Sequence, residues 1–138
     1  MFDTVFGRNN GNDKKAYVNW ITLDSSDQLE VIRKLSKSET ILIFKHSTRC
    51  VISSMVKKQF ENAFNSSMRN LKVYYLDVLS FRNISNEVSQ TYKVVHQSPQ
   101  LLIIKNETVV VHASHHDIVQ VQMASYLSIL KSLDYRYS

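Results

Sequence analysis

Cys50 is the only cysteine of the 138-residue chain, and it stands where two sequence patterns meet. The apolar run ILIF, residues 41–44, leads into it, and an amphipathic stretch follows it. A cysteine placed there is either buried filler or a nucleophile. The thiolate is the form that attacks disulfides, and the unpaired N–H groups and dipole of a helix N-terminus favour such an anion. If a helix starts at Cys50, its position therefore favours the nucleophile.

The sequence around Cys50 is basic. Residues 40–60 contain no acidic side chain. Their basic residues are Lys45, Arg49, Lys57 and Lys58. One interpretation is an ordinary solvated surface, and the alternative is a site for an anionic ligand or substrate. In the second case Arg49 and Lys45 add positive charge near the thiol, although we expect Lys45 to be solvated. We interpret His46 as a hydrogen-bonded residue at a strand end rather than a proton shuttle.

Ser53 lies three residues after Cys50, where a dithiol oxidoreductase carries its second cysteine. The segment CVIS is therefore a CxxC pattern whose resolving thiol is replaced by a hydroxyl. Serine is also common three residues into any helix, so the pattern alone is weak. The Ser53 hydroxyl could hydrogen-bond a thiolate across the first helical turn, but it cannot close a disulfide. A mixed disulfide on Cys50 must then be resolved by an external thiol.

The elements that must position these residues alternate between strand and helix patterns. Strands are predicted at residues 20–23, 40–46, 71–79 and on both sides of a polar turn at Asn106 and Glu107. Helices are predicted at residues 24–35, after Cys50, at 83–94 and at 119–130. The helix after Cys50 is predicted from the spacing of Ile52, Met55, Val56, Phe60 and Ala63. Ser85 is a possible cap of the next helix. The last helix is predicted from Val119, Met123, Tyr126, Leu127 and Leu130.

This order predicts an α/β fold in a single domain: a central mixed sheet flanked by helices, with parallel pairing and a terminal antiparallel hairpin. It is the order of a thioredoxin-like fold. We expect this domain to cover residues 17–138. Residues 1–16 are polar, rich in asparagine and hold both glycines, so they are expected to form a flexible tail.

Pro99 gives an independent check, because it is the only proline and stands directly before the apolar run QLLII. Proline cannot donate a hydrogen bond to a sheet, so a strand entrance is a sensible place for it in any fold. Thioredoxin folds put a cis-proline at this place, beside the active cysteine. The residue before it, here Ser98, offers its backbone groups to an extended thiol substrate.

With these residues considered, the chain resembles the monothiol bacilliredoxins of the bacillithiol system, the YtxJ-like proteins of thioredoxin fold. The resemblance runs from about Trp20 to Leu130. Three segments carry it: FKHSTRCVIS, VHQSPQLLIIKN and HASHHDI. It implies that Cys50 is the redox-active thiol and that Pro99 is the cis-proline. It also implies the substrate class, which is proteins that carry a bacillithiol mixed disulfide.

Attack by Cys50 would free the client thiol and leave bacillithiol on Cys50. Bacillithiol is then a co-substrate, and no bound cofactor is expected. The expected partners are S-thiolated client proteins and a low-molecular-weight thiol. We expect the substrate contacts to come from five residues beside the thiol: Thr48, Arg49, Ser53, Ser98 and Pro99.

The chain departs from many members of that family at two positions. Val51 stands where they have a proline directly after the cysteine, which could loosen the helix start and alter the redox potential. Glu107 stands where they have glycine in the hairpin turn, which concerns only the turn geometry. The nucleophile itself is retained.

Other function classes find less support. Lys and Arg outnumber Asp and Glu by 17 to 12, but no basic stripe with interleaved aromatic residues indicates nucleic acid. No apolar run is long enough for a membrane span or placed as a secretory signal, and a lone cysteine suits a reducing compartment, so we expect a cytoplasmic protein. His112, His115 and His116 lack a partner set for zinc, so no metal site is expected and surface or capping roles are favoured.

Two hypotheses remain. The first is a monothiol thiol-disulfide oxidoreductase that acts through Cys50. The second is a non-catalytic binding or redox-sensing module of thioredoxin fold, in which the cysteine is regulatory or inert.

Overall fold

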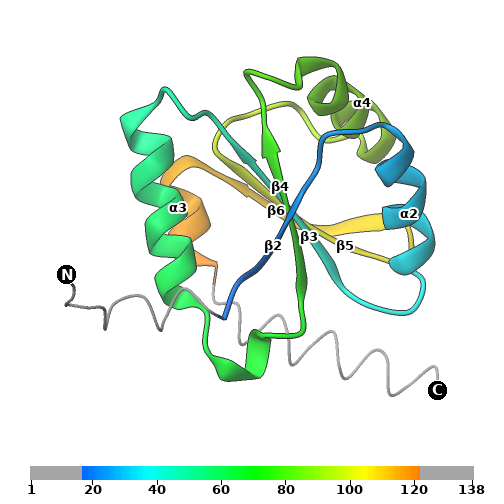
Figure 1. Ribbon diagram of the computed structural model, residues 1–138, viewed down its shortest axis with the longest axis horizontal. Helices are drawn as coiled ribbons and strands as arrows, with labels where there is room; N and C mark the ends of the chain where they lie inside the picture. Colours follow the sequence, from blue (N-terminus) through cyan, green and yellow to red (C-terminus); the bar gives the residue numbers. More distant parts are fainter. Residues whose placement is uncertain (1–16, 122–138) are drawn as a thin grey trace, which may run out of the picture.

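The computed structural model describes residues 17–121. The strands of this part of the chain form one five-stranded mixed sheet in the order β2-β4-β3-β5-β6 (Figure 1). The strands are β2 (Asn19–Thr22), β3 (Ile41–His46), β4 (Lys72–Asp77), β5 (Gln100–Lys105) and β6 (Thr108–Ser114). β4 pairs in parallel with both β2 and β3, whereas β5 is antiparallel to β3 and to β6. The predicted α/β fold class with a mixed sheet is therefore confirmed.

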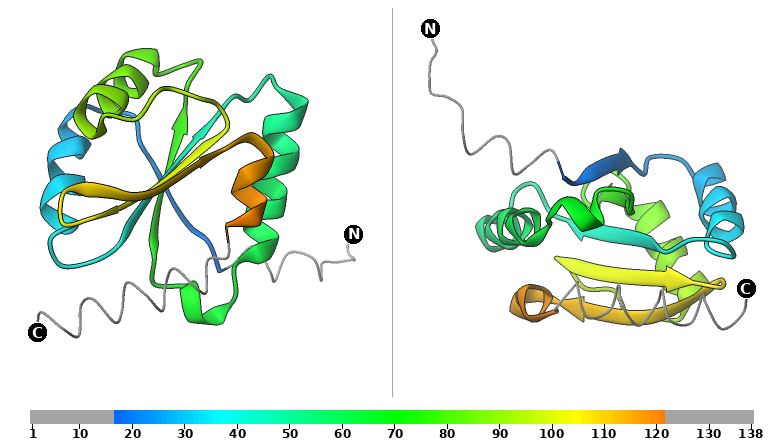
Figure 2. Two further views of the ribbon diagram at one scale, coloured as in Figure 1. Left: turned by 180° about the vertical axis from the view of Figure 1, so that it is seen from behind. Right: turned by 90° about the horizontal axis from the view of Figure 1, so that it is seen from below.

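Helices cover both faces of the sheet. On one face lie α3 (Val51–Ala63) and the 3₁₀ helix η2 (His115–Gln120), side by side in Figures 1 and 2. On the other face lie α2 (Asp27–Leu35) and α4 (Arg82–Tyr92). A second 3₁₀ helix, η1 (Ser66–Met68), connects α3 to β4.

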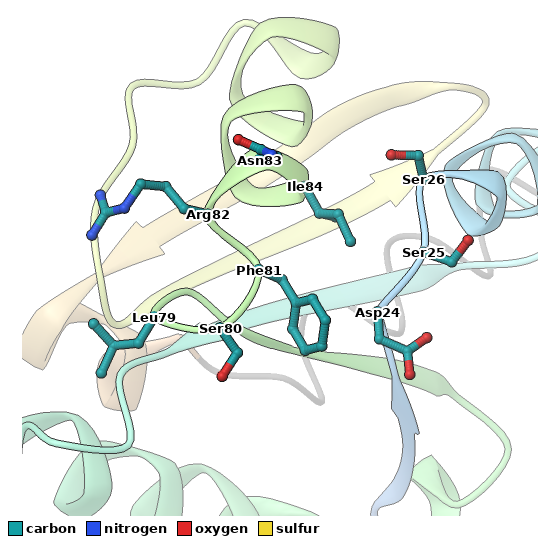
Figure 3. Close-up of a pocket in the computed structure, with 9 residues that line it drawn as sticks. All are labelled: Asp24, Ser25, Ser26, Leu79, Ser80, Phe81, Arg82, Asn83 and Ile84. Carbon is teal, nitrogen blue, oxygen red and sulfur yellow. The ribbon is translucent and has the colours of Figure 1, made fainter.

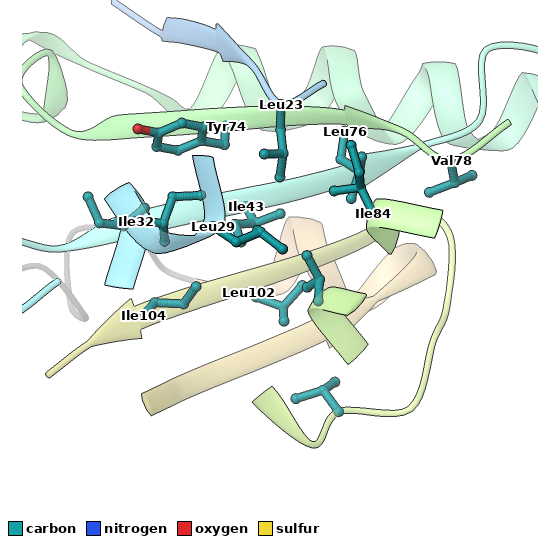
Figure 4. Close-up of a cluster of buried hydrophobic side chains, with 13 residues drawn as sticks. Leu23, Leu29, Ile32, Ile43, Tyr74, Leu76, Val78, Ile84, Leu102 and Ile104 are labelled. Carbon is teal, nitrogen blue, oxygen red and sulfur yellow. The ribbon is translucent and has the colours of Figure 1, made fainter. Parts of the chain in front are cut away.

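β3 is the central strand, and all six of its residues are buried. Successive side chains of a strand point to opposite faces, so β3 contributes to two separate cores. Leu42 and Phe44 pack in the cluster under α3, and Ile41 and Ile43 pack in the cluster under α2 and α4. Figure 4 shows the second cluster. Burial on both faces explains why the sequence of β3 is a continuous apolar run instead of an alternating one.

The predicted hairpin between β5 and β6 is confirmed, and its turn explains one departure from the family. Asn106 and Glu107 both have left-handed backbone angles, with φ of 52° and 65°, as a two-residue type I′ turn requires. Glycine adopts this conformation most easily. Glu107 is held there by its N–H, which donates to Ser36 Oγ at 2.9 Å, and by its carboxylate, which pairs with Arg33 at 2.9 Å.

Some sequence predictions on helices were wrong. Ser85 does not cap α4, because the helix begins at Arg82 and Ser85 is buried inside it. The helix predicted after Cys50 is present as α3, although two residues of the spacing that predicted it, Ile52 and Met55, are about half exposed. At the expected start of the last helix Val119 is exposed, and the neighbouring Ile118 is the buried residue. The rest of that helix and the tail at residues 1–16 lie outside the described residues.

Candidate active site at the start of α3

The site lies where the chain leaves the carboxyl ends of two adjacent parallel strands. After β3 the chain turns into α3 on one face of the sheet, and after β4 it turns into α4 on the other face. Ligands of open α/β sheets bind in the crevice at such a topological switch point. A backbone hydrogen bond of 3.0 Å from Val78 N–H to the His46 carbonyl ties the two departing loops together.

Cys50 is the N-cap residue of α3, as the sequence predicted for a helix that starts at this cysteine. Its backbone is extended, with φ of −101° and ψ of 120°, and its carbonyl accepts the first helical hydrogen bond from Ser54 N–H at 3.1 Å. The thiol makes no capping hydrogen bond, and the first turn of α3 holds no acidic residue. The free N–H groups and the positive end of the helix dipole therefore lie next to a partly exposed sulfur.

A hollow beside Cys50 brings Thr48 and Arg49 together with the thiol, as expected. Its lining residues are Thr48, Arg49, Cys50, Val51, Ser54, Met55 and Lys58. The sequence analysis missed Ser54 and Met55 as members of the site and did not single out Lys58. The available signal was the four-residue spacing from Cys50 to Ser54 and from Ser54 to Lys58, which puts these residues on one face of the helix.

Ser53 points inward rather than into this hollow. It is fully buried, its Oγ lies 2.7 Å from His46 Nδ1, and it accepts a hydrogen bond of 3.1 Å from Ser47 N–H. His46 is therefore the hydrogen-bonded strand-end residue that the sequence suggested. Burial lowers the pKa of the His46 imidazole, and the nearby Lys57 charge lowers it further. The Ser53 hydroxyl therefore fixes the loop between β3 and α3. The expected contact between Ser53 and the substrate stays a prediction.

The expectation for Lys45 was wrong in two respects. Lys45 is completely buried instead of solvated. It also lies on the face of β3 that packs against α4, where its Nζ contacts Ser85 and Ser89. Since α3 lies on the opposite face, Lys45 does not line the hollow of Cys50. The positive charges there are Arg49 and Lys58.

Pro99 is buried at the same end of the sheet as the carboxyl end of β3. The Ser98–Pro99 peptide bond is cis, as the resemblance implied. Pro99 directly precedes Gln100, the Cα partner of Lys45, so it lies beside the end of β3 that leads into the cysteine loop. Its carbonyl accepts a hydrogen bond of 2.9 Å from His115 N–H. The Ser98 hydroxyl is buried and has no hydrogen-bond partner among the described residues. Neither residue lines the hollow of Cys50.

The remaining ionisable residues have structural surroundings. His112, His115 and His116 are exposed, in agreement with surface roles. Within residues 17–121 no three His, Cys, Asp or Glu side chains are grouped as a metal site. Asp77 accepts hydrogen bonds from Leu79 N–H at 3.1 Å and Ser80 Oγ at 3.0 Å, so its carboxylate is satisfied by its neighbours.

A second hollow lies between the starts of α2 and α4 and contains no cysteine (Figure 3). Serine, aspartate and apolar side chains line it, and the Arg82 side chain points away from Asp24 in this view. It belongs to the opposite face of the sheet from α3 and brings together none of the predicted site residues.

Comparisons with known proteins agree with this geometry. Residues 21–123 match the family model described as Monothiol bacilliredoxin BrxC. The chain belongs to this family. This family and the thioredoxin fold support a thiol-disulfide oxidoreductase.

Solved structures show the same fold. One, described as a proposed oxidoreductase with a thioredoxin fold, is 31% identical, with a TM-score of 0.66 over 77% of this chain and 91% of its own. The thioredoxin of Trypanosoma brucei brucei is 15% identical, with a TM-score of 0.65 over 83% of this chain and 94% of its own. The thioredoxin of Malassezia sympodialis is 20% identical, with a TM-score of 0.60 over 75% and 84%. The last two support the fold alone.

Among residues 17–121, none of the helices has the length and apolar character needed to cross a bilayer.

Proposed function

We propose that the protein is a monothiol bacilliredoxin that removes bacillithiol, or a similar low-molecular-weight thiol, from protein mixed disulfides through Cys50. The observation that carries this proposal is the position of Cys50: a partly exposed N-cap thiol, in a hollow with Arg49 and Lys58, at the switch point of the sheet. Membership of the family supports the same chemistry. We place the protein in a reducing cytoplasm, where a lone thiol stays available.

The reaction is a thiol–disulfide exchange. The Cys50 thiolate attacks the bacillithiol sulfur of the mixed disulfide, a new disulfide forms between them, and the client sulfur leaves as a thiolate that takes up a proton. No electrons are gained or lost overall. Because the chain has no second cysteine, the reaction stops with bacillithiol on Cys50. A second molecule of a small thiol must then attack this disulfide to restore the enzyme.

The charge of the hollow supports an anionic co-substrate. Bacillithiol carries carboxylates, and the hollow beside Cys50 contains two cations, Arg49 and Lys58, and no acidic residue. Exposed apolar side chains also border the thiol: Val51 is 73% exposed and Met55 54% exposed. We propose that the cations bind the small thiol and that the apolar rim contacts the client protein.

The test is to mix the reduced protein with a bacillithiolated client and to follow both by intact mass. Wild type should gain the adduct while the client loses it, and Cys50→Ser should do neither. A parallel reaction with a glutathionylated client measures the preference for bacillithiol. If wild type strips the client no faster than Cys50→Ser does, the protein is instead the non-catalytic binding or sensing module of the alternative hypothesis.

A further inference from the structure

A buried lysine lies behind the loop that leads into Ser98 and Pro99. Lys45 is completely buried, and its Nζ lies 3.1 Å from the Ser85 carbonyl, 2.9 Å from Ser89 Oγ and 3.2 Å from His96 Nδ1. An ammonium group has three N–H donors and no acceptor. Three acceptors are present here, so the buried charge is fully hydrogen-bonded.

This arrangement determines the state of His96. The ammonium of Lys45 can only donate, so Nδ1 of His96 must be the unprotonated nitrogen and the ring proton must lie on Nε2. Ser85 Oγ also lies 3.2 Å from the same Nδ1. The cluster is therefore built for a neutral His96 in one tautomer.

His96 belongs to the short connection between α4 and β5. This connection follows Lys93, which ends α4 in a left-handed conformation. Gln100, the Cα partner of Lys45 across the sheet, donates a hydrogen bond of 3.0 Å from its Nε2 to the Val95 carbonyl. Two neighbouring side chains of the β3–β5 pair therefore hold two consecutive loop residues, Val95 and His96, and only Gln97 separates His96 from Ser98.

We propose that Lys45 is a positioning residue for thiol exchange: through His96 it holds residues 94–98 in the conformation that presents the backbone of Ser98 to a thiolated substrate. This inference rests on the proposed function. The Lys45 side chain contacts α4, which covers the opposite face of the sheet from α3 (Figure 1), and it does not line the hollow of Cys50. It acts on the substrate only through the loop.

The charges around His96 make this contact sensitive to acid. Burial lowers the pKa of His96, and the positive charges of Lys45 on β3 and Arg82 on α4 lower it further. The neighbouring residue on β5, Gln100, is neutral. His96 is therefore an acceptor at neutral pH. When it is protonated at lower pH, its Nδ1–H faces the Lys45 ammonium, and the loop must be released.

The experiment compares Lys45→Met, which keeps the length of the side chain without its donors, with His96→Ala, a change at an exposed residue that spares the core. His112→Ala, at an exposed histidine of β6, is the matched control. Two rates are measured for each protein: transfer from a thiolated client to Cys50, and alkylation of Cys50 by iodoacetamide, which needs no substrate loop. The ¹⁵N shifts of the His96 ring report its tautomer independently of activity.

We expect Lys45→Met and His96→Ala each to slow transfer from the thiolated client to Cys50 about tenfold. This is less than the roughly hundredfold loss of rate that a 1 Å misplacement of reacting groups can cause. Alkylation should be unchanged, and Lys45→Met should mix the tautomers of His96. Transfer at the wild-type rate in both variants would overturn the positioning role and leave the proposed function intact. An equal loss in transfer and alkylation would also overturn it, since it would indicate general damage. If wild type itself transfers nothing, the proposed function fails, and the substrate role of the loop fails with it.

Discussion

The burial of Lys45 predicts an unusual dependence of stability on pH. Burial lowers the pKa of Lys45 from 10.5 to about 8. The folded protein thus binds this proton less tightly than the unfolded chain does. Stability is reduced while both states are protonated, and it rises as the pH passes from the folded towards the unfolded pKa. Between about pH 7 and pH 9.5 this one group should add at most about 2 kcal/mol to the free energy of unfolding.

The assay is urea unfolding of wild type and Lys45→Met at several pH values in that window. The window ends below the range in which tyrosines ionise, because burial raises the pKa of Tyr74, Tyr75 and Tyr92 and their ionisation would lower stability. All other groups are common to both proteins and cancel in the difference. Wild type should gain stability relative to Lys45→Met as the pH rises.

Lys34→Met, at an exposed lysine of α2, is the control for a lost charge. Its free energy of unfolding should change with pH in parallel with that of wild type. At neutral pH, replacement of the buried charge by an apolar side chain of similar length can be neutral or stabilising. Parallel curves for wild type and Lys45→Met would refute the reasoning, because they would mean that the folded protein holds the Lys45 proton as tightly as the unfolded chain.

Three further predictions follow from other contacts. Ser53→Ala should lower the free energy of unfolding by about 1–3 kcal/mol in urea titrations, since it leaves the buried His46 nitrogen and a backbone N–H without their partner; an unchanged midpoint would contradict this. The double variant Arg49→Gln, Lys58→Gln should slow exchange with an anionic small-molecule disulfide up to about tenfold but not with a neutral one, and added salt should shrink the difference. Equal slowing of both would exclude charge recognition. Glu107→Gly should stabilise the hairpin by up to about 1 kcal/mol, because relief of the left-handed backbone exceeds the loss of an exposed ion pair; a clear loss of stability by thermal unfolding would disprove it.

The fold was predictable because its signals are local. The alternation of apolar runs and helical spacing gave the element order, and the polar pair Asn106 and Glu107 marked the hairpin. The helix start at Cys50 was also visible, since the pattern changes at that residue. Each of these depends on residues within a few positions of one another.

The surroundings of Lys45 were not predictable for the opposite reason. Its three hydrogen-bond partners are 40, 44 and 51 residues away in the sequence, and a lysine at a strand end is normally solvated. The helical period also failed to distinguish a core stripe from an apolar rim: Val56 is buried, whereas Met55 is exposed beside the thiol. Spacing shows which residues share a face of α3, but only the packing of the helix shows which face meets the sheet.

The last two residues of β3 connect these observations, because they point to opposite faces of the sheet. His46 faces α3, where its contact with Ser53 fixes the loop that carries Cys50. Lys45 faces α4, where its contact with His96 fixes the loop that leads to Pro99. The proposed thiol exchange uses both loops at once, one for the nucleophile and one for the substrate. A single rigid strand, buried on both faces, can hold them in constant relation, and a shift of one residue in its register would exchange the two side chains and disrupt both contacts.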